Sequence, residues 1–233
     1  MKYDTILFDA DGTLLDFLRS EKEAVYEALC EIGLEPDEEM LATYSRINDG
    51  LWKKLERREI EKKVLLYHRF ELLFEQYGID ADARDMANRY MHTLSQKGYL
   101  LDGAEELCSK LLGKFRLYIV TNGVEFIQRG RYARCGIDRY FDGVFISDAI
   151  GAEKPSVEYF EYVAAHIPEF SKERTLIVGD SLTSDIRGGI NYGIDTCWYD
   201  PAGKEAPEDM RDKITYIADS FDSVYSFIMQ GEG

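Results

Sequence analysis

Short apolar runs alternate with helical patterns through much of the chain. The runs that predict strands are Thr5–Phe8, Phe115–Val120, Val144–Ile146, Thr175–Val178 and Thr196–Tyr199. The segments between the later runs carry apolar residues at helical spacing, and they predict helices over Ala104–Leu112, Val124–Cys135, Val157–His166 and Ser184–Asn191, with Gly193 ending the last. Short apolar strands that alternate with helices indicate an α/β fold, a Rossmann-like parallel sheet wound on both faces.

A long helical insertion separates the first predicted strand from the second. More than a hundred residues lie between them, whereas a simple strand-to-helix loop needs only about 2–6. Ser20 and Glu23 have the spacing of a capping box, Pro36 precedes a second helix, and Gly33 and Gly78 follow apolar helical runs. We predict an inserted helical subdomain over residues 16–97 and a core over 1–15 and 98–233. Because the insertion follows the first strand directly, it can act as a lid over that end of the sheet.

Composition narrows the class of protein and its partners. The chain has 233 residues, 45% of them hydrophobic, and a net charge of −16. Such a charge argues against nucleic-acid polymers and anionic membranes as partners, but a small phosphorylated substrate remains compatible with it. No apolar run approaches the roughly 20 residues of a membrane span, and Asp4 comes too early for a signal peptide. The four cysteines are widely separated. We therefore expect a cytoplasmic protein.

The most distinctive motif directly follows the first strand. Residues 9–13 read Asp-Ala-Asp-Gly-Thr, so two carboxylates stand at the end of a buried strand. Like charges this close repel each other and require water or a counter-ion. On an extended chain residues i and i+2 face the same way, so Asp9 and Asp11 could share one divalent metal. The alternative interpretation is an ordinary strand-to-loop turn, in which Asp and Gly are common.

Three later segments place further polar residues at comparable positions. Thr121, Asn122 and Gly123 follow the second strand, Lys154 stands just before a helix, and Gly179-Asp180-Ser181 follows the fourth strand, with Asp185 five residues after Asp180. In open α/β sheets, ligands bind beyond the carboxyl ends of the strands. Lys154 taken alone is typical of a surface lysine; the surrounding motifs favour a functional role.

Together the four segments resemble the haloacid dehalogenase (HAD) superfamily of phosphohydrolases. The resemblance covers most of the chain outside the helical insertion, and it implies the HAD fold with a helical cap at that insertion. It also implies a metal held by the Asp9 side chain, the Asp11 backbone carbonyl and the Asp180 side chain. Hard oxygen ligands select Mg²⁺ rather than zinc. Asp185 would lie close to these ligands, or it is an acid favoured by a helix N-terminus.

The same residues suggest a phosphatase mechanism. Asp9 would attack phosphorus and form an aspartyl-phosphate, and Asp11 would protonate the leaving alcohol and later accept a proton from water. Thr121 and Lys154 would bind the phosphate oxygens that are not transferred. The backbone N–H groups of Asn122 and Gly123, at a predicted helix start, would provide an anion site.

A narrower resemblance points to the house-cleaning pyrimidine 5′-nucleotidase group. It rests on residues 120–123 with Gln128, 136–142, 146–147, 188–193 and 196–198, and on 48–52 and 69–70 in the insertion. It implies hydrolysis of pyrimidine nucleoside monophosphates. Trp52 could stack on a base, or it is a core residue of the cap. The segment from Arg46 to Glu71 has eight Lys and Arg against five acids, which predicts either a solvated helix face or a basic rim that attracts anionic substrates.

Other functions share much of this motif set. A phosphatase of sugar phosphates or phosphoglycolate would keep all of it, and so would a phosphomutase. A 2-haloacid dehalogenase does not require the acid supplied by Asp11. A phosphate-sensing binding protein need not retain both Asp9 and Asp11, and this chain has both.

Overall fold

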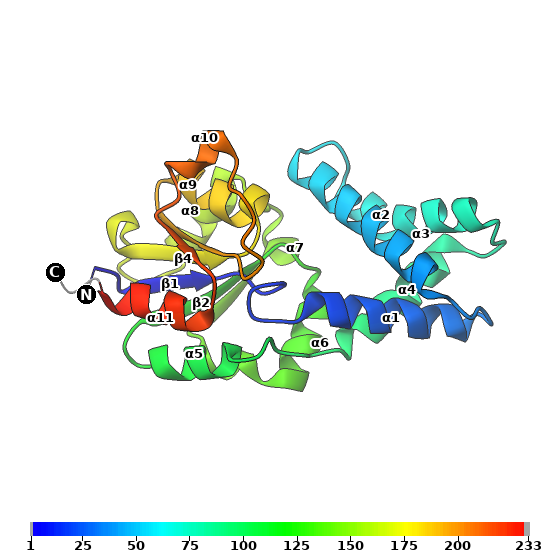
Figure 1. The fold of residues 1–233 in the computed structure, drawn as a ribbon, viewed down its shortest axis with the longest axis horizontal. Coiled ribbons are helices and arrows are strands. Elements are labelled where there is room, and N and C mark those ends of the chain that lie inside the picture. The colour runs from blue at the N-terminus through cyan, green and yellow to red at the C-terminus, as the bar shows by residue number, and fades with distance from the viewer. Residues whose placement is uncertain (1, 231–233) are drawn as a thin grey trace.

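The computed structural model describes residues 2–230 and contains a six-stranded parallel sheet at its centre (Figure 1). The strand order is β3-β2-β1-β4-β5-β6. The strands are β1 (Thr5–Phe8), β2 (Arg116–Thr121), β3 (Gly143–Ile146), β4 (Thr175–Gly179), β5 (Asp195–Tyr199) and β6 (Tyr216–Ala218). The chain runs outwards from β1 to β3 and then crosses to β4 on the other side of β1. This crossing creates a switch point between the carboxyl ends of β1 and β4, the position that favours ligand binding.

Helices cover both faces of the sheet, as expected for a doubly wound fold. Ile6 and Phe8 of β1 pack on one face together with α5 (Ala104–Leu111), α6 (Glu125–Cys135) and α11 (Phe221–Gln230). Leu7 points to the other face, which α8 (Val157–Ala165) and α9 (Arg187–Tyr192) cover. The alternation along β1 is the period-2 pattern of a strand buried on both sides. The predicted fold class is confirmed.

The insertion after β1 folds as four helices, and these lie beside the core (Figure 1). They are α1 (Phe17–Glu31), α2 (Glu38–Glu56), α3 (Lys62–Tyr77) and α4 (Ala83–Ser95). Their shared interior centres on Tyr44, Phe70 and Tyr90, whose ring centroids lie 5.2–5.6 Å apart. The insertion therefore has an apolar core of its own.

The chain enters and leaves the insertion through two segments that lie side by side. Leu15 bridges Leu100 in antiparallel register, the Asp16 N–H donates to the Tyr99 carbonyl at 2.9 Å, and the Leu101 N–H donates to the Leu14 carbonyl at 3.0 Å. We call these segments, residues 14–16 and 97–101, the two crossings. The chain therefore enters and leaves the insertion at one paired place.

Several local predictions need correction. The capping box at Ser20 is wrong, because Asp16 caps α1 by accepting from the Arg19 N–H, and Ser20 lies buried inside the helix. The expected helix over Ser184–Asn191 is divided into a π-helical turn, η3 (Leu182–Ile186), followed by α9. Gly193 does end α9 in a left-handed conformation, with φ +83°.

The remaining elements are short. They are α7 (Ser147–Ile150), α10 (Glu208–Arg211) and the 3-10 turns η1 (Ile137–Tyr140) and η2 (Lys172–Arg174). Within residues 2–230, no helix is both long enough and apolar enough to cross a membrane.

Candidate active site

Three aspartates meet at the carboxyl ends of β1 and β4. Asp9 directly follows β1, Asp180 follows β4, and Asp185 belongs to η3. One carboxylate oxygen from each lies within 4.8 Å of the others, and both Asp9 and Asp185 are buried. The strand register explains why Asp9 and Asp180 meet. Phe8 of β1 pairs with Val178 of β4, so the residues that follow the two strands lie side by side at the edge of the sheet.

Lys154 is the buried counter-charge of this cluster. Its Nζ donates to Asp9 Oδ1 at 2.6 Å, Asp185 Oδ1 at 2.7 Å and the Val120 carbonyl at 2.7 Å. The side chain is 1% exposed, so Lys154 is not the surface lysine that the residue would suggest if taken alone. Burial alone would lower the pKa of Lys154, but Asp185 and Asp9 outweigh it and raise the pKa above its usual value. Lys154 is therefore a protonated, fully paired ammonium.

The carboxylates carry more negative charge than Lys154 can balance. Burial raises the pKa of Asp9 well above its usual range, and the charge of Asp185 adds to this while Lys154 opposes it. Burial and Asp185 likewise raise the pKa of Asp180 to about 7. Three carboxylates and one ammonium leave a formal excess of two negative charges when all are ionised. Oxygen donors with that excess fit a divalent cation.

Two small residues allow this close approach. Gly12 has φ +84°, and a Cβ there would lie 2.6 Å from Asp180 Oδ2. A Cβ on Gly179 would lie 2.4 Å from the Asp185 carboxylate. Neither site has room for a larger residue, and Gly12 also needs the left-handed backbone.

The Asp11 carboxylate is directed elsewhere. Arg131 of α6 forms an ion pair with its Oδ1, and Gln128 Nε2 donates to its Oδ2 at 2.6 Å. The side chains of Asp9 and Asp11 therefore do not face the same way, as they would on an extended chain. The i, i+2 rule applies along a strand, and β1 ends at Phe8, before either aspartate. The Asp11 side chain instead faces α6.

Hydroxyl groups organise the cluster. Thr13 Oγ1 accepts from the Asp180 N–H at 3.0 Å and lies 3.4 Å from Asp9 Oδ2 and 3.3 Å from Asp180 Oδ1. Thr13 is fully buried and was not predicted as a site residue, although it belongs to the first motif. It links the two aspartates that follow β1 and β4.

The loop after β2 differs in detail from the sequence prediction. Thr121 is buried, and its Oγ1 accepts from the Gly123 N–H and from Gln128 Nε2, both at 3.1 Å. The Gly123 N–H therefore already has an acceptor, which a phosphate oxygen bound there would have to replace. The Asn122 side chain exchanges two hydrogen bonds of 2.8 Å with the backbone of Lys154. Asn122 thus fixes the segment that carries the lysine.

The C-terminal end of α2 brings the insertion close to this cluster. Glu56 lies beside Thr183 of η3, and burial, with a contribution from Asp185, raises its pKa. Lys62, at the start of α3, donates to Ser147 Oγ at 2.7 Å and pairs with Glu153 at 3.4 Å. A cavity of about 400 Å³ lies at this junction and is lined by Leu55, Arg58, Glu59, Ile60, Glu61, Lys62 and Glu153. The sequence offered no signal for Glu56 beyond its helical position.

Most other residues singled out in the insertion have structural partners. Trp52 is partly buried and packs against Leu51, Leu55 and Leu65. Asn48 and Arg69 are buried, bond each other at 3.0 Å, and reach Glu21 inside the bundle through Asn48 Nδ2 at 2.6 Å. The local basic excess is largely paired at the surface, in the pairs Lys53–Asp49, Arg57–Glu59, Arg58–Glu158 and Lys63–Glu61. This pattern favours a solvated helix face.

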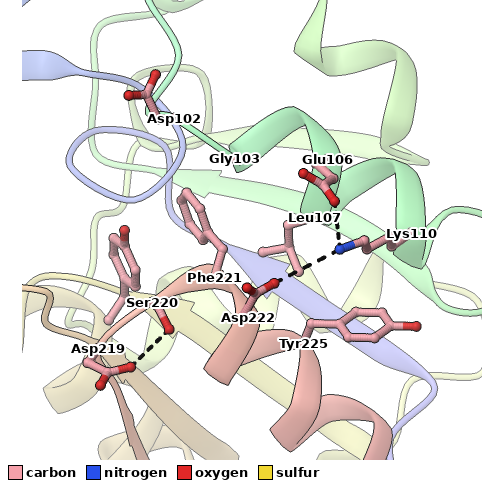
Figure 2. Close-up of a pocket in the computed structure, with 11 residues that line it drawn as sticks. Asp102, Gly103, Glu106, Leu107, Lys110, Asp219, Ser220, Phe221, Asp222 and Tyr225 are labelled. Carbon is pink, nitrogen blue, oxygen red and sulfur yellow. Dashed lines mark hydrogen bonds and ion pairs between the residues drawn. The ribbon is translucent and has the colours of Figure 1, made fainter.

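A second cavity, of about 300 Å³, lies between α5 and α11 (Figure 2). Tyr199 and Phe221 stack there with centroids 4.7 Å apart, and Lys110 pairs with Glu106 at 2.8 Å. None of the four motifs contributes to its lining, so this cavity is separate from the aspartate cluster.

Comparison with known proteins identifies the family. A family model of the haloacid dehalogenase-like hydrolases matches residues 3–193. The chain belongs to the HAD-like hydrolase family. It is 43% identical over 202 residues to pyrimidine 5′-nucleotidase PynA of Streptococcus pneumoniae, covering 86% of this chain and 85% of that one. It is 31% identical over 208 residues to pyrimidine 5′-nucleotidase YjjG of Escherichia coli, covering 89% and 91%.

A solved structure agrees with this placement. The magnesium-bound HAD-hydrolase YfnB of Bacillus subtilis superposes with a TM-score of 0.93 at 38% identity, covering 98% of this chain and 99% of that one. The predicted resemblance to HAD hydrolases and to pyrimidine 5′-nucleotidases is thereby confirmed, and the protein is a HAD-type phosphatase.

Proposed function

We propose that this HAD hydrolase is a Mg²⁺-dependent phosphomonoesterase that acts on pyrimidine nucleoside 5′-monophosphates through an aspartyl-phosphate. The observation that carries the proposal is the buried cluster of Asp9, Asp180 and Asp185 with one lysine, Lys154. Such a cluster is costly unless a cation or a reaction uses it. The relatives PynA and YjjG, named as pyrimidine 5′-nucleotidases, support the substrate class.

In this proposal Asp9 is the nucleophile. One of its oxygens bonds to phosphorus as the bond from phosphorus to the ester oxygen breaks, and Asp11 gives its proton to the departing alcohol. Asp11 then takes a proton from the water that cleaves the aspartyl-phosphate and restores Asp9. Thr121, Lys154 and the backbone of Asn122 and Gly123 remain the proposed phosphate-binding groups. Because Lys154 uses all three of its N–H groups, a phosphate oxygen there would replace one of its present acceptors.

Mg²⁺ would be held by the side chains of Asp9 and Asp180 and the backbone carbonyl of Asp11. When bound, it would neutralise phosphate charge and orient the phosphoryl group for attack. A cation beside Asp9 would also favour its ionised form, which attack requires. Asp185 supports these ligands by pairing with Lys154 and by accepting from the Ser181 N–H at 3.1 Å.

Residues 16–97 would act as the cap, with α2 presenting substrate-facing groups. Trp52 and Glu56 are four residues apart, so they share one face of α2. Glu56 already lies beside η3, which carries Asp185. In this proposal Trp52 would meet a base whose phosphate is at Asp9. A cytoplasmic location belongs to the same proposal, supported by four free cysteines.

Substrate selectivity provides the experiment for this function. With Mg²⁺, pyrimidine monophosphates such as dUMP and dTMP should exceed purine ones by at least about tenfold in kcat/KM, a gap of ~1.4 kcal/mol. Base binding far from phosphorus would position the phosphate for attack. The measurement is a screen of nucleotides, sugar phosphates and phosphoglycolate, with and without chelator.

Trp52→Ala should lower the pyrimidine-to-purine ratio of kcat/KM by a larger factor than it lowers kcat/KM for an aryl phosphate, which has no base. Phe74→Leu, at a buried position in the apolar core of the insertion, is the matched control for general destabilisation. Equal rates on pyrimidine, purine and sugar phosphates would reject the nucleotidase function and leave a general phosphatase. Full turnover in chelator would reject the role of the metal.

Metal binding should also depend on pH. The pKa of Asp180 is raised from 3.8 to about 7. Between these two pH values, and without metal, the folded protein keeps a proton on Asp180 that the unfolded chain has lost. The stability from that proton is lost as pH rises towards about 7. Mg²⁺ must displace it, so the rise in Tm on adding Mg²⁺ should be larger one pH unit above that pKa than one unit below. Asp180→Asn should reduce this difference, and a Mg²⁺ effect independent of pH would contradict the assignment.

A further inference from the structure

Arg131 of α6 is a buried cation outside the aspartate cluster. The residue is 0% exposed, and its Nη1 forms the ion pair with Asp11 Oδ1. Burying a guanidinium is costly unless its hydrogen bonds are satisfied. The four motifs assign Arg131 no role, although it lies only three residues after Gln128.

The other contacts of Arg131 lead to the place where the insertion joins the core. Its Nε donates to the Lys97 carbonyl at 3.1 Å, and its Nη2 donates to Ser20 Oγ at 3.4 Å. Ser20 Oγ itself donates to the Asp16 carbonyl at 2.6 Å and lies 3.1 Å from the Lys97 carbonyl. The guanidinium is therefore bonded to one crossing directly, at Lys97, and to the other through Ser20 of α1, while one of its nitrogens reaches Asp11.

Gln128 completes the arrangement one turn earlier on α6. Its Nε2 donates to Asp11 Oδ2 at 2.6 Å and to Thr121 Oγ1 at 3.1 Å, and its Oε1 accepts from Arg131 Nη1 at 3.4 Å. Each oxygen of Asp11 thus has its own donor. Such a two-point contact fixes the direction of a carboxylate as well as its distance.

We propose that Arg131, assisted by Gln128, is the positioning residue for Asp11, and that its bonds to Lys97 and Ser20 fix the position of the Asp11 carboxyl relative to the helical insertion. The inference rests on the proposed function, in which Asp11 protonates the leaving alcohol. A proton donor must be held within hydrogen-bond reach of the leaving oxygen, and a misplaced one loses most of its effect. Arg131 acts through Asp11 and does not touch the substrate.

The test compares two leaving groups. A nucleotide or alkyl phosphate leaves as an alkoxide that needs a proton, whereas p-nitrophenyl phosphate leaves as a stable anion. Arg131→Met should lower kcat/KM for the alkyl ester at least about tenfold more than for the aryl ester, ~1.4 kcal/mol of selective loss. Arg134→Met, an exposed arginine one turn later that bonds Gln96, should change neither.

A double-mutant cycle separates positioning from general damage. In an Asp11→Asn background, Arg131→Met should cause little further loss on the alkyl ester, because the group that it positions is already inactive. Gln128→Met keeps the Arg131–Asp11 ion pair but removes the donor to Asp11 Oδ2. It should therefore show a smaller selective loss of kcat/KM on the alkyl ester. This variant replaces Arg131→Met in the test if Arg131→Met folds poorly.

Each other outcome overturns the assignment. Equal losses on both esters would indicate a purely structural role, and faster turnover would mean that Arg131 holds Asp11 away from its working position. Additive losses in the double mutant would also contradict positioning. A wild-type protein without any phosphatase activity overturns the proposed function and this inference together, whereas an active wild type with equal losses overturns only the inference.

Discussion

Asp9→Asn is expected to abolish turnover of both nucleotide and aryl phosphates. The substitution removes the attacking carboxylate oxygen but hardly changes volume, and the amide oxygen can still accept from Lys154 Nζ, which lies 2.6 Å from Asp9 Oδ1. The loss should exceed about a hundredfold in kcat/KM, or ~2.7 kcal/mol of transition-state stabilisation. Single-turnover assays with Mg²⁺ should detect no phosphorylated enzyme.

Stability measurements distinguish this loss of chemistry from a loss of fold. Because burial and Asp185 raise the pKa of Asp9, its ionised form is unfavourable without metal, so Asp9→Asn should not lower Tm in chelator. Asp212→Asn, at an exposed position after α10, is the matched control and should keep full activity. More than about 1% residual activity in Asp9→Asn would reject nucleophilic catalysis by Asp9.

Lys154→Met should have the second largest effect, on stability as well as activity. Lys154 is 1% exposed and is the ammonium between Asp9 and Asp185. Removing one partner of a buried ion pair typically costs about 3–5 kcal/mol, because the remaining charges lose their compensation. We expect that loss in urea unfolding without metal, together with at least a hundredfold loss of kcat/KM, about 2.7 kcal/mol.

The dependence on Mg²⁺ makes this second prediction specific. Without Lys154 a bound cation would be the main counter-charge of the aspartates, so Mg²⁺ should stabilise Lys154→Met more than wild type. Lys213→Met, at an exposed position, is the control and should behave like wild type. Unchanged stability in chelator would mean that the Lys154 pair does not hold the cluster together.

Much of the fold followed from local signals. The apolar runs at Thr5–Phe8 and Thr175–Val178 predicted their strands because a strand buried on both faces must be apolar throughout. Strand β6 escaped prediction because it has only three residues, one of them exposed, at the edge of the sheet. The predicted start of α1 lay too far along the chain because Ser20 matched a capping box. In the structure the Asp16 side chain caps the helix by accepting from the Arg19 N–H.

For the site, the amino-acid sequence by itself determined which groups gather at the carboxyl edge of the sheet. Asp9, Thr121 and Asp180 each follow an apolar run, and parallel strands bring such positions to one edge whatever their separation in the chain. The tertiary structure alone decided how the side chains pair. Asp11 meets Arg131 across 120 positions, and Asp185 meets Lys154 across 31. These partners follow from the packing of α6 and η3 against the sheet, because burial leaves a charged side chain only the partners within reach.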